Sequence, residues 1–119
     1  MNQKLVMCAL IAIALTMAFC KAKKTVAAPA PDAFSKQFSV AEKRWTGVQP
    51  EELRQGHTIY TTKCTRCHGN FEITRFSESK WLHEIDEMAP KAKLTAEEKD
   101  KLTKHILSYR EAFASAAAK

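Results

Sequence analysis

Hydrophobic residues recur at helical spacing in three stretches of the chain, with polar residues between them. We find no stretch with the pattern of a β-strand. The spacing predicts three helices. The positions that share a face are Leu53, Gly56, Tyr60 and Lys63 or Cys64 on the first helix, Trp81, Ile85 and Met88 on the second, and Leu102, Ile106, Tyr109 and Phe113 on the third. The pattern therefore predicts an all-α protein.

Local signals mark where these helices begin and end. Pro50, followed by two glutamates, is a favourable early residue for the first helix. Ser77 or Ser79 can cap the second helix, and Pro90 is expected to end it. Thr95 opens a capping box for the third helix, which we expect to run to about residue 113.

Residues 1–20 have the pattern of an export signal. A short positive start precedes an apolar run over residues 5–19, which is shorter than the roughly 20 residues of a membrane-spanning helix. Three fates of this segment remain open: cleavage before Cys20 with lipid on its thiol, ordinary cleavage after Ala22, or retention as an uncleaved anchor. The position of Cys20 favours the first, although Phe19 departs from the small residues of lipoprotein signals. We therefore expect a protein in the periplasm or lipid-anchored on the extracytoplasmic face of a membrane.

Residues 21–44 separate this segment from the expected domain. Up to about Pro31 they are rich in Ala, Pro and Lys, which is typical of a solvated linker. Phe34, Phe38 and Ala41 then lie at helical spacing, which predicts a short helix packed on the domain. The domain itself is expected over residues 45–113, followed by a tail over residues 114–119.

One motif carries most of the candidate chemistry. Cys64 and Cys67 are three residues apart and His68 follows directly, and in an exported protein this C-x-x-C-H spacing is typical of c-type haem attachment. Both thiols lie on one side of a helical turn, where they can bond the vinyl groups along one edge of a porphyrin. His68 is then expected to be the proximal iron ligand. A zinc half-site and a redox dithiol are the alternatives, but the remaining histidines are scattered and no strands surround the motif.

The distal side of the iron has several candidate ligands. Met88 shares a helix face with Trp81 and Ile85, and a His/Met pair is the common ligation of electron-transfer haems. His83 lies about 200° around that helix from Trp81, at roughly 100° per residue, so it faces away. His57 lies upstream of the attachment motif. We expect Met88 to be the distal ligand, with His83 or an open position as alternatives.

Charge and cysteine content limit the partners. The 119-residue chain has a formal net charge of +6, and +5 without residues 1–19, which hold one lysine and no acid. A basic domain suits acidic docking surfaces on redox partner proteins or an anionic membrane, and no basic stripe interleaved with aromatic residues points to nucleic acid. Outside the motif, Cys8 lies in the export segment, which leaves Cys20 and implies no disulfide framework. Candidate docking residues near the motif and Met88 are Lys63, Arg66, Lys91 and Lys93.

The motif and its surroundings resemble a known family. Gly56, Tyr60 and Cys64 to His68 together are similar to the first helix of class I c-type cytochromes. The wider pattern resembles small exported monohaem cytochromes of bacteria, often lipoproteins, and its further matches are Trp45-Thr46-Gly47, Leu53, Trp81, Ile85, Met88 to Leu94, and Thr95 to Glu98. This resemblance covers roughly residues 45–110 and implies a compact cytochrome c-like fold of about three helices around one covalently attached haem c. The interval from His68 to Met88 is shorter than in many class I cytochromes.

In that family a glycine and an aromatic residue of the first helix cross the C-terminal helix. The crossing implied for this chain involves Gly56, Tyr60, Ile106 and Tyr109. Leu107 falls off the apolar stripe of the last helix and is expected to be exposed or to form a small contact patch. His105, at the edge of the stripe, is expected to be half-buried.

These features together predict a non-enzymatic carrier of single electrons. The haem would supply the redox chemistry, and the protein would supply ligands, burial and a docking surface. Two alternatives remain: a haem sensor or ligand-binding domain with an open or displaceable sixth position, and a haem subunit of a larger oxidoreductase.

Overall fold

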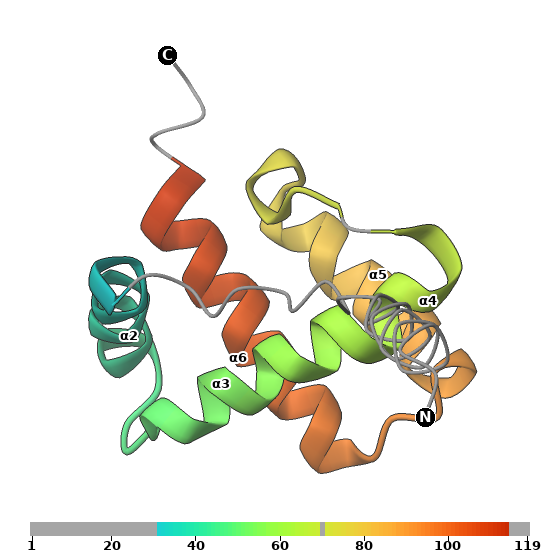
Figure 1. The fold of residues 1–119 in the computed structure, drawn as a ribbon, viewed down its shortest axis with the longest axis horizontal. Helices are drawn as coiled ribbons and strands as arrows, with labels where there is room; N and C mark the ends of the chain where they lie inside the picture. Colours follow the sequence, from blue (N-terminus) through green and yellow to red (C-terminus); the bar gives the residue numbers. More distant parts are fainter. Residues whose placement is uncertain (1–30, 70, 115–119) are drawn as a thin grey trace, which may run out of the picture.

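The computed structural model describes residues 31–69 and 71–114. Regular structure in these residues is entirely helical, which confirms the predicted all-α class. The elements are α2 (Pro31–Arg44), α3 (Pro50–Ile59), the π-helix η1 (Tyr60–Cys64), α4 (Thr65–His68), the 3-10 helix η2 (Ile73–Arg75), α5 (Glu78–Lys91) and α6 (Ala96–Phe113) (Figure 1). The predicted signal segment, Cys20, linker residues 21–30 and tail residues 115–119 lie outside the described residues.

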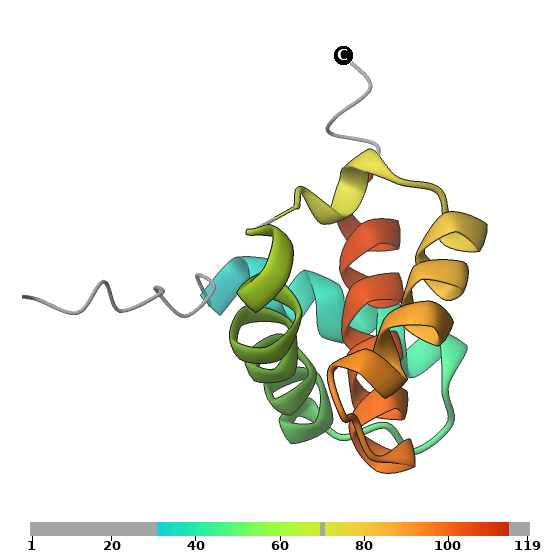
Figure 2. The same ribbon diagram turned by 90° about the vertical axis from the view of Figure 1, so that its right-hand side faces the viewer.

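Helix α6 is the centre of the fold and contacts α2, α3, α5 and η2. Figure 1 shows α2 and α5 on opposite sides of α6, with α3 crossing it, and Figure 2 shows α3 and α5 flanking it in the turned view. The helix begins with the predicted capping box, in which the Glu98 N–H donates to Thr95 Oγ1 at 3.1 Å and the Thr95 N–H donates to the Glu98 carboxylate at 3.0 Å. Leu102 and Ile106 of α6 are buried in the main core.

The crossing of α3 and α6 differs from the expected one. A Cβ atom added to Gly56 would lie 2.2 Å from the backbone oxygen of Lys101 and 2.6 Å from the Cβ of His105. The backbones therefore meet about one turn nearer the start of α6 than the predicted contact with Ile106. Tyr60, one turn after Gly56, does reach the core cluster that contains Ile106. Only glycine allows such a close approach, because a backbone oxygen cannot rotate away.

Helix α2 packs on α6 and is part of the folded domain. The domain therefore has one more long helix than the three or so that were expected. The amide nitrogen of buried Gln37 lies 3.0 Å from both Nδ1 and the backbone oxygen of His105, and 3.0 Å from Ser108 Oγ. His105 and Leu107 are only 2% and 3% exposed, so the expectations of a half-buried histidine and an exposed leucine are wrong. The reason is that α6 is covered on several sides, whereas a single apolar stripe predicts one covered side.

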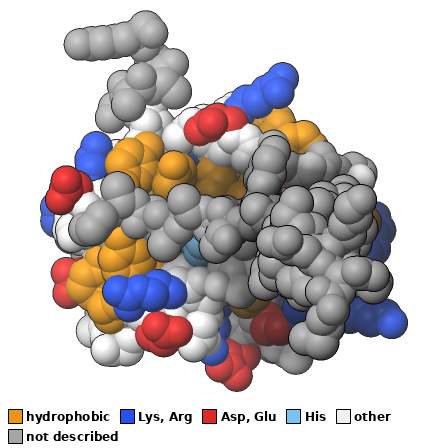
Figure 3. Space-filling model, in the orientation of Figure 1, with side chains coloured by type: hydrophobic (Ala, Val, Ile, Leu, Met, Phe, Trp, Pro, Cys, Tyr) orange, Lys and Arg blue, Asp and Glu red, His pale blue; other side chains and the backbone are white. Residues whose placement is uncertain are grey.

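Ion pairs join the helices at the surface. The Arg44 guanidinium on α2 pairs with Glu78 on α5, and Lys104 on α6 lies 3.3 Å from Glu52 on α3. Figure 3 shows positive and negative side chains interspersed over the described surface of one face. Exposed pairs of this kind contribute about 0–1 kcal/mol each, so packing carries most of the stability. Within residues 31–69 and 71–114, no helix is long and apolar enough to cross a membrane.

Candidate functional site

A cavity of about 650 Å³ lies between the η1–α4 segment and α5, with α6 behind it. Its walls are mostly apolar, which is typical of a site for a large non-polar ligand. The residues that line it are Tyr60, Lys63, Cys64, Arg66, Cys67, Gly69, Phe71, Phe76, Lys80, Trp81, Glu84, Ile85, Met88, Ala89, Lys91, Ala92, Lys93, Leu94, Leu102 and Ile106. Its volume falls within the roughly 300–1,000 Å³ of small-molecule and cofactor sites.

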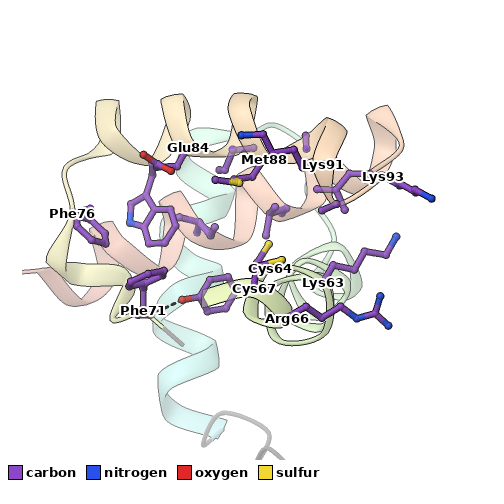
Figure 4. A pocket seen from close by; sticks show the side chains of 18 of the residues that line it. Lys63, Cys64, Arg66, Cys67, Phe71, Phe76, Glu84, Met88, Lys91 and Lys93 are labelled. Atoms are coloured by element: carbon purple, nitrogen blue, oxygen red, sulfur yellow. Dashed lines mark hydrogen bonds between the residues drawn. The ribbon is translucent and has the colours of Figure 1, made fainter. Parts of the chain in front are cut away.

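Both motif cysteines line this cavity, and both are free thiols. Cys64 is half-buried, and this burial raises the pKa of its thiol, whereas Cys67 is exposed. Figure 4 shows the two sulfur atoms on the same wall of the cavity. His68 is the last residue of α4, and its side chain lies outside the described part of the structure.

The π-helix η1 brings Cys64 to this wall. A π-helix bonds residues five apart instead of four, and such turns occur frequently at functional sites. Threonine hydroxyl groups add donors along this segment: Thr61 Oγ1 donates to the His57 oxygen at 3.0 Å, which also accepts the Tyr60 N–H, and Thr65 Oγ1 donates to the Thr61 oxygen at 2.6 Å. Sequence reasoning missed this segment and predicted an uninterrupted helix up to the motif.

Met88 reaches the cavity from the opposite wall, on α5 (Figure 4). His83, the rival ligand on the same helix, is exposed and does not line the cavity. His57 also lies outside the lining and is stacked edge-on against His105, with 5.1 Å between ring centroids; burial lowers the pKa of His57. Of Met88, His83 and His57, the structure therefore brings Met88 to the same cavity as the cysteines.

The end of α5 fixes the position of Met88. The helix continues through Pro90 to residue 91, so the expectation that Pro90 ends it was wrong by about one residue. Its turn closes with the Leu94 N–H donating to the Ala89 oxygen at 2.9 Å and the Lys93 N–H donating to the Pro90 oxygen at 3.1 Å. This is a Schellman cap, and Lys93 occupies its left-handed position with a φ of 53°.

Side-chain donors from three elements hold the segment between the motif and α5. Tyr60 Oη of η1 donates to the Phe71 oxygen at 2.5 Å, and Trp81 Nε1 of α5 donates to the Ile73 oxygen at 2.8 Å. From α6, Arg110 Nε donates to the Phe76 oxygen at 2.7 Å. The segment thereby forms an aromatic wall of the cavity. Sequence reasoning missed Phe71 and Phe76, because no periodic pattern marks a loop.

The rim of the cavity is mainly basic. Five of the lining residues are lysines or arginines, and the four predicted docking residues, Lys63, Arg66, Lys91 and Lys93, are among them. Lys80 on α5 is the fifth and pairs with Glu84, whereas Lys63 pairs with Glu98 at 2.6 Å between Nζ and Oε1. Such a rim favours contact with acidic surfaces.

The residues present suit a large, flat, apolar group that is held by thiols. Two thiols stand on one wall, a methionine sulfur stands on the other, and aromatic side chains enclose the space between them. In the described part of the chain, no group of three or more His, Cys, Asp or Glu residues is placed to hold a metal ion by itself. No protein-family model, curated protein or solved structure matches this chain.

Proposed function

We propose that this protein is a single-electron carrier with one covalently attached haem c. The observation that carries the proposal is the placement of Cys64 and Cys67 opposite Met88 across one apolar cavity. The spacing of the motif agrees with it, because two thiols on one wall can hold one edge of a porphyrin. Met88 is in place to approach the ring from the other side.

Each residue of the site has a separate role in this proposal. When bound, a haem supplies a one-electron redox couple. Cys64 and Cys67 hold its edge, His68 is its proximal ligand, and Met88 is its distal ligand, whose thioether raises the reduction potential. The aromatic and aliphatic walls exclude water, which also affects the potential. The protein itself carries out no bond-breaking chemistry and in this proposal is not an enzyme.

The basic rim supports redox proteins with acidic docking surfaces as partners. Lysine and arginine side chains around the cavity would steer such partners toward the exposed edge of the haem, and the association would weaken with salt. The resemblance to exported monohaem cytochromes adds a location, the periplasm or the outer side of a membrane. Lipid on Cys20 would hold the domain there.

Covalent haem attachment is the first test. The chain is produced in bacteria that carry haem-attachment machinery, and the purified protein is denatured and extracted with acidified organic solvent. We expect the haem colour and the mass of one haem to remain with the polypeptide. Single variants Cys64→Ala and Cys67→Ala should each retain at most one thioether bond, and the double variant should lose its haem on extraction.

The matched control is Cys20→Ser, which removes a cysteine outside the motif and should leave the haem attached. A wild-type protein that stays colourless under these conditions would refute the proposal. Covalent haem that survives extraction in the double variant would show that the motif is not the attachment site.

A further inference from the structure

Helix α5 presents two neighbouring rows of side chains to the cavity. Trp81, Ile85 and Ala89 are buried and belong to the apolar wall. The adjacent row, at positions i, i+4 and i+8, consists of Lys80, Glu84 and Met88, and all three line the cavity. Figure 4 shows Glu84 beside Met88, on the wall opposite Cys64 and Cys67. A carboxylate therefore stands one helical turn from the proposed distal ligand.

Glu84 differs from the other charges of the rim. Among the described residues that line the cavity it is the one acidic side chain, and the other charged ones are basic. Lys80 holds it from one turn earlier on α5, with 2.5 Å between Nζ and Oε1. The lysine lowers the pKa of the Glu84 carboxyl group, so the carboxylate is ionised at neutral pH.

We propose that the Glu84–Lys80 pair lowers the reduction potential of the haem in this cavity. This inference rests on the proposed function. Oxidised iron carries one more positive charge than reduced iron, so a nearby carboxylate stabilises the oxidised form and lowers the potential. Lys80 has the opposite effect. Both side chains line the cavity but are also open to solvent, with 51% of the Lys80 and 36% of the Glu84 side chain exposed, so water and salt reduce their effect on the iron without removing it.

The charges of Glu84 and Lys80 do not have equal effects on the proposed iron. Glu84 lies between Lys80 and Met88 along the helix, one turn from each, and is therefore nearer the proposed ligand than its partner is. Since the interaction of two charges falls with distance, the carboxylate has the larger effect on the iron. The net effect of the pair is to lower the potential below that of a neutral wall.

The test is a redox titration of the haem-loaded protein at constant pH and ionic strength. Glu84→Gln should shift the equilibrium toward the reduced form by about 3- to 10-fold, which is a rise of roughly 30–60 mV for a one-electron couple. Lys80→Gln should shift it in the opposite direction by a smaller factor. The double variant should lie between wild type and Glu84→Gln. A loosened fold would not give shifts of opposite sign.

Asp86→Asn is the matched control, since it removes an acidic charge from the same helix. Asp86 pairs with Lys99 at 2.7 Å between Oδ1 and Nζ and does not line the cavity. Its variant should stay close to the wild-type potential. A shift in Glu84→Gln no larger than that in Asp86→Asn would overturn the inference while leaving the haem carrier intact. A wild-type protein without haem would instead overturn the proposed function.

Discussion

The close approach of α3 and α6 gives a sharp prediction for Gly56→Ala. In an exposed helix this change stabilises a protein by up to about 1 kcal/mol, because alanine has the higher helix propensity. Here the added Cβ would lie 2.2 Å from the Lys101 backbone oxygen, well inside ordinary contact. Neither atom belongs to a flexible side chain, so the two helices must move apart by about 1 Å before the contact is acceptable.

That movement opens the core around Leu53, Leu102 and Ile106, which are almost fully buried. Overpacking of this kind costs roughly 1–3 kcal/mol and more where the backbone must shift, so we expect a net loss of about 2–4 kcal/mol in the free energy of unfolding. For a domain of this size each kcal/mol lowers Tm by roughly 4–8 °C, so Tm should drop by at least about 8 °C. Thermal unfolding followed by far-ultraviolet circular dichroism measures this drop.

Gln55→Ala is the control, because Gln55 is an exposed neighbour on the same helix. Its variant should differ from wild type by less than about 0.5 kcal/mol, as surface changes usually do. If Gly56→Ala were neutral or stabilising, as helix propensity alone predicts, the close crossing of α3 and α6 would be wrong.

Three further predictions concern His105, Trp81 and Lys93. Burial lowers the pKa of His105 to about 3, so the neutral ring contributes its full stability above pH 6.5. The free energy of unfolding should therefore fall by up to about 1.4 kcal/mol per pH unit as the pH drops from 6.5 toward 3. In denaturant titrations, the free energy of unfolding of His105→Leu should depend less on pH over this range. Trp81→Phe removes the donor to the Ile73 oxygen and should cost about 1–2 kcal/mol in urea unfolding; an unchanged midpoint would contradict the role of this bond. Lys93→Gly relieves the left-handed conformation and should raise the free energy of unfolding by about 0.5–1 kcal/mol, whereas lower stability in thermal unfolding would contradict it.

Local signals in the sequence predicted the helices well. The capping box at Thr95 and the cap at Ser77, whose Oγ accepts from the Lys80 N–H at 3.2 Å, stand where the sequence placed them. A capping residue bonds to residues only three or four positions away, so these signals do not depend on the rest of the fold. The helical spacing of Phe34, Phe38 and Ala41 likewise corresponds to α2.

Contacts between distant elements were harder to predict. His105 is buried because Gln37, 68 residues earlier in the chain, packs against it, and nothing near His105 in the sequence indicates this. Leu107 belongs to the same core cluster as Ile73, which lies in a short helix without a periodic pattern. The register of the crossing at Gly56 depends on both helices at once. One apolar stripe cannot specify how many neighbours cover a helix.

In the candidate site, too, local patterns were predictable from the sequence and contacts between distant elements were not. Cys64, Cys67 and Met88 were found from the motif and from the helix face, and the structure brings all three to one cavity. Glu84 was not found, because a glutamate on a helix is usually a solvated residue. Its position one turn from Met88 becomes significant only when the wall opposite the cysteines is known.

The central claim is a haem held between the motif and Met88, and the optical spectrum of the oxidised and reduced protein tests it most directly. The oxidised wild-type protein should show the weak near-infrared band of sulfur-to-iron charge transfer, and Met88→Ala should lose it. His83→Ala, which alters an exposed residue of the same helix, should retain the band. The reduced wild-type protein should not bind carbon monoxide, because its sixth position is filled. A wild-type spectrum without the band, together with carbon monoxide binding, would contradict the account and indicate an open, ligand-binding haem.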